Sequence, residues 1–127
     1  MEGENETAGA VLGRDAILAL RAQPRAVERV EAFGSHVLVQ ALTAKEKDAF
    51  DASLIVGSGK HQRVATANIR ARLAARSIVD EAGKLIFTDA DADTLGDLPG
   101  ADLQRIYDAA QRLSGISDAD VEELAGN

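Results

Sequence analysis

The chain of 127 residues contains no cysteine, no tryptophan, two prolines and only four aromatic residues. Without cysteine it has no disulfide framework, no thiolate zinc site and no cysteine nucleophile. No apolar run approaches the roughly 18 consecutive residues of a membrane span. The first six residues include three glutamates, whereas a signal peptide is basic and then apolar. We therefore expect a soluble cytoplasmic protein with no membrane contact.

The net charge of −7 and the pI near 4.7 argue against a general affinity for nucleic acid or anionic lipid. A phosphate backbone repels a surface of this average charge. The aromatics also do not interleave with basic residues, so the stacking platforms of single-strand binders are missing. They are Phe33, Phe50, Phe87 and Tyr107. We expect no nucleic-acid partner.

The charge is strongly segregated along the chain. Residues 1–56 carry a net charge of −3 and residues 80–127 carry −9, whereas residues 57–79 carry five bases and no acid. One interpretation is that these charges pair within a single folded chain. The other is head-to-tail self-association, which generates rings or filaments. The candidate residues for self-association are Arg70, Arg72, Arg76, Asp89, Asp91 and Asp93.

The length and the 46% hydrophobic content predict one domain with one core, over residues 13–127. Residues 1–12 are polar, acidic and without period, so we expect a disordered leader there. The predicted fold class is α+β and mostly α, with short helices packed together and one small β-hairpin near the N-terminal third.

Local signals place these elements along the sequence. A short helix is expected up to Arg21, before Pro24. Two valine-rich segments, 26–32 and 36–42, indicate an antiparallel hairpin with Gly34 and Ser35 between them. Thr43 and Glu46 form a capping box for a helix that ends at residues 57–59. Further helices are predicted over residues 63–79, 89–95 and 99–113. Gly96 is expected in a left-handed stop position, Gly115 ends the third helix, and a last helix follows Ser117.

Two segments imitate known binding loops imperfectly. Residues 56–61 contain a Gly-Lys pair, but Leu54 occupies the first glycine position of a phosphate-binding loop and His61 replaces its metal-binding hydroxyl. A flexible connection between helices is the expected alternative. Residues 89–93 alternate carboxylates as a calcium loop does, but lack the following glycine and the bidentate glutamate. Acids at a helix N-terminus explain the latter pattern.

No pattern in the chain indicates an enzyme. His36 and His61 have no neighbouring ligand or nucleophile. Glu122 and Glu123 are adjacent, so they point in different directions on a helix. We expect no catalytic residue, no metal and no cofactor. Val121 and Leu124 form a short apolar strip flanked by acids, which either docks on the chain's own core or binds a partner.

Several segments carry a resemblance through their order and spacing. They are residues 42–50, 68–73, 78–87, 95–96 and 110–127. Together they resemble the tail assembly chaperones of long-tailed bacteriophages and prophages, over roughly residues 14–127. Each motif alone is a cap, a turn or an amphipathic stripe, and the leader departs from the shorter starts of that family.

The resemblance implies a small, mainly helical and non-catalytic protein that coats the tape-measure protein before the tail tube polymerises around it. It also implies self-assembly into rings or filaments, action in the cytoplasm of the bacterial host and absence from the mature virion. The major tail tube protein is a further candidate partner. In many relatives a ribosomal frameshift adds a second domain.

Two other functions remain open on the sequence. One is a minor structural or joining component of the phage tail. The other is a small regulatory or nucleic-acid-binding protein that uses residues 57–79. If copies associate through charge, raising the salt concentration should dissociate them, because surface ion pairs are screened.

Overall fold

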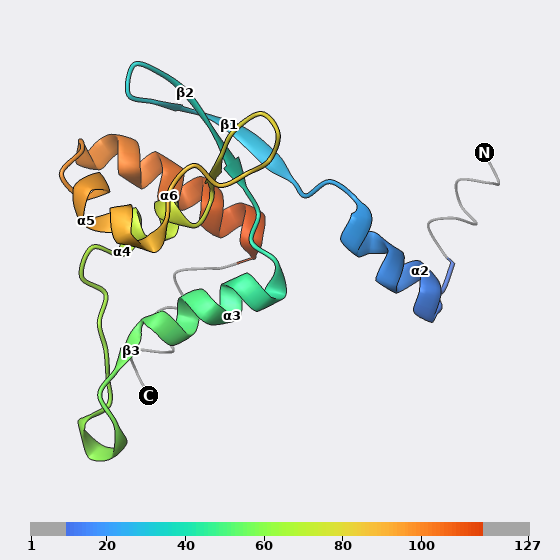
Figure 1. Cartoon of the computed structure of the whole chain (residues 1–127), viewed down its shortest axis with the longest axis horizontal. Helices are drawn as coiled ribbons and strands as arrows, with labels where there is room; N and C mark the ends of the chain where they lie inside the picture. Colours follow the sequence, from blue (N-terminus) through green and yellow to red (C-terminus); the bar gives the residue numbers. More distant parts are fainter. Residues whose placement is uncertain (1–9, 116–127) are drawn as a thin grey trace.

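The computed structural model describes residues 10–115, which form short helices and two small antiparallel sheets (Figure 1). This is an α+β fold with more helix than strand. Of the expected leader, residues 10–12 are described, and they are exposed. The expected last helix, with Val121 and Leu124, lies outside the described residues.

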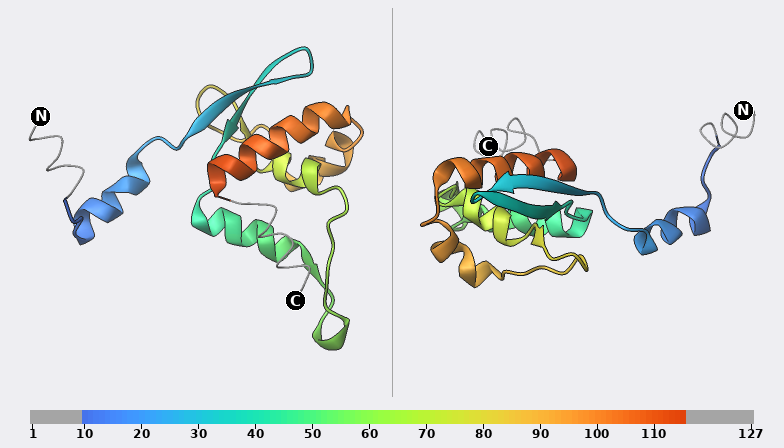
Figure 2. Two further views of the ribbon diagram at one scale, coloured as in Figure 1. Left: turned by 180° about the vertical axis from the view of Figure 1, so that it is seen from behind. Right: turned by 90° about the horizontal axis from the view of Figure 1, so that it is seen from above.

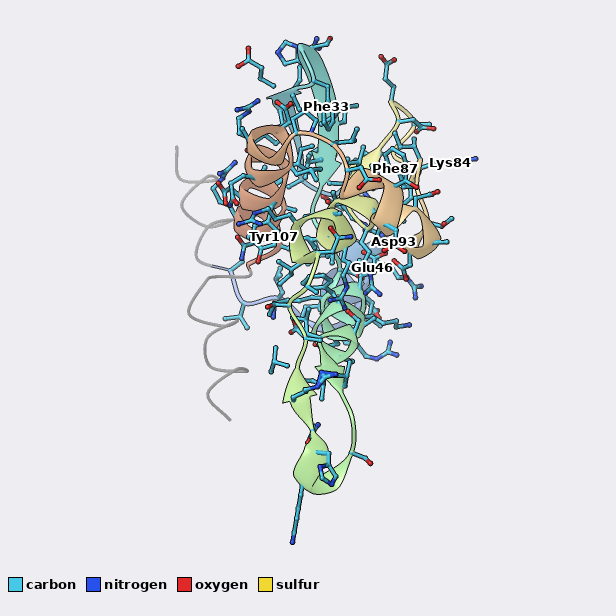
Figure 3. All side chains as sticks on the ribbon, turned by 90° about the vertical axis from the view of Figure 1, so that its left-hand side faces the viewer. Phe33, Glu46, Lys84, Phe87, Asp93 and Tyr107 are labelled. Atoms are coloured by element: carbon cyan, nitrogen blue, oxygen red, sulfur yellow. The ribbon has the colours of Figure 1, made fainter. Side chains whose placement is uncertain are left out.

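The valine-rich segments pair as antiparallel strands β1 (Val27–Ala32) and β2 (Ser35–Gln40). Phe33 and Gly34 connect them, with φ of 57° and 76°. Positive φ at both positions gives the turn a twist that matches the strands. The turn therefore starts one residue earlier than predicted, and Phe33 lies at the tip of the hairpin (Figure 3).

A third strand, β5 (Ile78–Val79), pairs with β2 and gives the sheet order β1-β2-β5. The prediction of one helix over residues 63–79 is therefore wrong at both ends. Its N-terminal part forms β4 (Arg63–Val64), paired with β3 (Ile55–Val56), and the helix α4 covers only Ile69–Ala75. Valine and isoleucine favour pleated, half-buried strands, and here cross-strand pairing outweighs the helix propensity of the alanines.

Helix α6 (Gly100–Ser114) packs across β1, β2 and α4 and completes the core. Its predicted apolar stripe is confirmed, since four members are buried and Leu113 packs against them. Gly115 ends it with φ of 72°, as expected. The buried members of the stripe are Leu103, Ile106, Tyr107 and Ala110.

Helix α3 (Ala44–Ser53) begins with the predicted capping box between Thr43 and Glu46. It ends at Ser53, four residues earlier than expected, because the chain then enters β3. The 3-10 helix η2 (Gly59–His61) forms the tip between β3 and β4. The segment containing the Gly-Lys pair therefore connects two strands, not two helices as expected.

The predicted helix over 89–95 forms as η3 (Asp89–Asp91) and α5 (Ala92–Leu95). Gly96 follows it with φ of −65°, so the expected left-handed stop is wrong. A Cβ at Gly96 would lie 2.4 Å from Oδ1 of Asn68, whose Nδ2 donates to the carbonyl of Ala92 at 2.9 Å. Glycine is needed here for this close approach of α5 to α4.

The N-terminal helix forms as α2 (Arg14–Ala19) and η1 (Leu20–Ala22), close to its predicted bounds. It projects away from the rest of the fold, beyond the start of β1 (Figures 1 and 2). None of its residues is buried. We call residues 10–22 the arm.

Candidate functional site

Arg72 is used inside the fold. Its guanidinium donates to the carbonyl and hydroxyl oxygens of Ser53 at 2.7 and 2.9 Å, and to the carbonyl of Ala65 at 3.0 Å. Ser53 is the last residue of α3 and Ala65 follows β4. The Arg72 side chain therefore joins α4 to the end of α3 and to the end of β4. A guanidinium suits this role because its donors have a fixed fork geometry.

Arg76 and Asp89 form a bidentate ion pair within the chain. Nε of Arg76 lies 3.1 Å from Oδ1 of Asp89, and Nη2 lies 3.2 Å from Oδ2. The Arg76 guanidinium also lies 5.6 Å from the centre of the Phe50 ring, a cation–π distance. The fold thus brings one predicted base and one predicted acid together in the same molecule.

The other four predicted self-association residues have separate surroundings. Arg70 donates to Gln104 on α6, and the Asp91 carboxylate accepts from the backbone amide of Thr88 at 2.8 Å. Asp93 is exposed on α5. Within residues 10–115, Arg76 and Asp89 are the members of this set that pair with each other, and self-association through these residues stays a prediction.

The two loop-like motifs fold into short helical segments and their connections. Residues 89–93 form η3 and the start of α5, and residues 10–115 contain no group of three or more His, Cys, Asp or Glu side chains placed to hold a metal. Gly57 has φ of 84°, and a Cβ there would lie 2.3 Å from the His61 carbonyl oxygen. Glycine is therefore needed at position 57 for the tight turn between β3 and β4. His36 and His61 are exposed on different elements.

The surface feature that the sequence did not identify as a site is apolar. Residues 84–87, which we call the ridge, run beside β5, with an antiparallel bridge between Val79 and Leu85. Leu85 and Ile86 are 51% and 52% exposed. In an extended segment neighbouring side chains point to opposite faces, and Leu85 and Ile86 accordingly line two different hollows.

The helix hollow, of about 390 Å³, lies between the ridge, α3 and α4. Its apolar lining comes from Ala49, Ala75, Leu85 and Phe87, with Glu46 and Asp89 also lining it. Figure 3 shows Phe87 and Glu46 on the side of the molecule that carries the ridge, away from Tyr107 of α6.

The sheet hollow, of about 610 Å³, lies between β2, β5 and the ridge. Its apolar residues include Val37, Leu38, Val79 and Ile86, and its charged residues are Asp80, Glu81 and Arg29. These three charges leave it with a net charge of −1.

Glu46 has a lowered pKa because of its hydrogen-bond and ion-pair partners. Partial burial by itself would raise its pKa. The hydrogen bond from the Thr43 amide at 2.9 Å and the guanidinium of Arg25 at 2.6 Å outweigh this effect and lower the pKa below 4.5. The carboxylate is thus held ionised beside the helix hollow.

No helix in residues 10–115 is long and apolar enough to cross a membrane. Comparison with protein-family models, with curated proteins and with solved structures finds no match to the chain.

Proposed function

We propose that the chain is a non-catalytic tail assembly chaperone. It holds the tape-measure protein in soluble form in the host cytoplasm, as an oligomer, until tail tube subunits replace it. The observation that supports this proposal best is the half-exposed ridge, which lines two open apolar hollows in a chain of only 127 residues. Clustered exposed apolar side chains mark interaction surfaces, whereas single ones do not.

The helix hollow fits the side of an amphipathic client helix. Leu85 and Phe87 provide apolar contact for the client's apolar stripe. Glu46 and Asp89, which are already paired with Arg25 and Arg76, border the hollow with polar groups. Each contact is small, so retention comes from many copies along one long client. Small contacts also allow one copy after another to be displaced by a tube subunit.

The charged residues have a secondary role in this proposal. Arg70 and Asp93 are exposed, so they are the members of the predicted self-association set that can pair between copies without disturbing the fold. Arg76 lines the helix hollow and pairs there with Asp89. Arg72 is bonded to Ser53 and Ala65, which do not line it.

The proposal is tested by co-expression with the tape-measure protein encoded in the same genome. We expect the client to be soluble with the wild-type chain and mostly insoluble with Leu85→Glu. Leu98→Glu is the matched control, since Leu98 is 39% exposed and lines neither hollow, and it should keep the client soluble. An insoluble client with the wild-type chain, or this chain as a constituent of purified virions, contradicts the proposal.

A further inference from the structure

The arm carries five large hydrophobic side chains that the rest of the described structure leaves uncovered. Their exposed fractions run from 42% for Leu18 to 96% for Val11. A helix this short is not stable in water by itself and needs an apolar surface against which to pack. The exposed set is Val11, Leu12, Ile17, Leu18 and Leu20.

The connection between the arm and β1 directs the arm away from the rest of its own chain. Gln23 has φ of −82° and ψ of 149°, and Pro24 follows it. Proline fixes its own φ and disfavours the helical region for the residue before it. The chain therefore leaves the arm in an extended direction, and the arm stands clear of the sheet (Figure 2).

The sheet hollow complements the arm in polarity and in charge. The hollow is lined by Val37, Leu38, Ile78, Val79 and Ile86, which match the apolar side chains of the arm. Residues 10–22 carry a net charge of +1, and the charges lining the hollow sum to −1. Within residues 10–115, neither Arg21 of the arm nor Glu81 of the hollow has an ion-pair partner.

We propose that the arm of one copy docks in the sheet hollow of a second copy. Each chain then offers one arm and one hollow, so the contact joins two different surfaces and repeats as a ring or a filament. Docking covers the exposed apolar side chains of the arm together with Ile86 of the ridge. This inference rests on the proposed self-assembly, and it leaves the helix hollow free for the client.

The first test measures the mass of the full chain alone, by light scattering and sedimentation from 5 to 500 µM. We expect the wild-type chain to assemble with concentration. The arm variant Ile17→Glu/Leu20→Glu and the hollow variant Ile86→Glu should each remain at the 13.3 kDa of one chain. Leu85→Glu is the matched control, because Leu85 is next to Ile86, equally exposed and lines the other hollow. It should assemble as the wild type does, and circular dichroism should show all variants folded.

The second test mixes the two variants that do not assemble. The arm variant still has a working hollow, and the hollow variant still has a working arm. An equimolar mixture should therefore form a complex of two chains and no larger species. A mixture that stays at one chain overturns the proposal.

Three other outcomes also overturn it. A wild-type chain that stays monomeric at 500 µM excludes arm exchange. So does an Ile86→Glu variant that assembles normally, as would occur if residues 116–127 or another segment covered the hollow. Assembly lost in Leu85→Glu places the contact elsewhere. None of these results involves the client, so they are distinct from failure of the chaperone proposal, which is measured by client solubility.

Discussion

Arg72 joins α4 to the two segments that flank the β3–β4 sheet. Its three hydrogen bonds end on Ser53 and Ala65, which are 19 and 7 residues away in the sequence. Hydrogen bonds that involve a charged group contribute more than neutral ones. The side chain is half-buried, so water replaces these bonds only in part.

Replacing Arg72 by alanine should lower the free energy of unfolding by about 2–3 kcal/mol, because charged hydrogen bonds to Ser53 and Ala65 are lost. Urea unfolding monitored by circular dichroism measures this. Arg63→Ala is the matched control, since Arg63 is exposed, and it should change stability by less than about 0.5 kcal/mol. Equal stability of the two variants contradicts the role given to Arg72.

Glu46 makes the stability depend on pH in the acid range. Its pKa in the folded chain is below the ordinary value of 4.5, so the stabilisation is complete above pH 4.5 and is lost as pH falls through the folded pKa. Glu46→Gln should lower the free energy of unfolding by about 0.5 kcal/mol at pH 7, the usual size for an exposed ion pair.

The difference between Glu46→Gln and the wild type should shrink as pH falls below 4.5, because the wild-type carboxylate then becomes protonated and loses its ion pair. Urea titrations at pH 7 and pH 3 measure it. Glu81→Gln, which removes a carboxylate with no ion-pair partner in residues 10–115, should show no difference at either pH. A Glu46→Gln difference that is as large at pH 3 as at pH 7 would show that the ion pair is not its cause.

The contact between α4 and α5 depends on the absence of a side chain at one position. Gly96 leaves room for Asn68, which has φ of 58° and starts α4. Asn68 cannot move away without losing its bond to the Ala92 carbonyl. This contact fixes the position of α5. It thereby also positions Asp89, which lines the helix hollow.

Gly96→Ala should therefore destabilise the chain by about 1–3 kcal/mol, the usual cost of forcing an extra group into a packed site. Gly100→Ala is the matched control, since no atom lies within 4 Å of its added Cβ and Gly100 is helical. It should be neutral or stabilise by up to about 1 kcal/mol. Thermal unfolding of both variants measures the difference, and a stable Gly96→Ala would show that Asn68 relaxes freely.

In the proposed function, two apolar surfaces of the chain have separate roles, one in assembly and one in client binding. The arm and the sheet hollow hold copies together, and the helix hollow holds the client. Leu85 and Ile86 belong to one extended segment, so the two surfaces lie back to back. Assembly thus sets the helix hollows of successive copies at regular intervals along the client.

The salt dependence of assembly distinguishes apolar docking from charge pairing. Between 50 and 500 mM salt we expect the mass of the assembly to stay constant or rise, because screening weakens ion pairs and leaves apolar burial intact. Arg70→Glu should also leave it unchanged. Dissociation at 500 mM salt, measured by light scattering, would instead support a contact between arginines 70–76 and the acids of the next copy.

The sequence predicts well those features whose signals lie within a few residues. The capping box at Thr43, the stripe on α6 and the Gly115 stop all form as expected. The helix predicted over 63–79 does not form over its full length, because Val64 and Ile78 pair with strands elsewhere in the chain. Local alanine content does not reveal these partners. The sequence identifies the charged residues, but it does not identify their partners within the chain.

Caps, turns and amphipathic periods act between neighbours in the chain, so the amino-acid order fixes where α2, α3, α6 and the β1–β2 hairpin form. Exposure and pairing depend on contacts between distant residues. The same kind of apolar pattern is core on α6 and exposed on the arm, because α6 packs against β1 and β2, whereas no residue of the arm is buried in the described part of the chain. Likewise the arginines of residues 70–76 look alike in the sequence, and only the folded chain gives Arg72 its carbonyl partners and Arg76 its carboxylate.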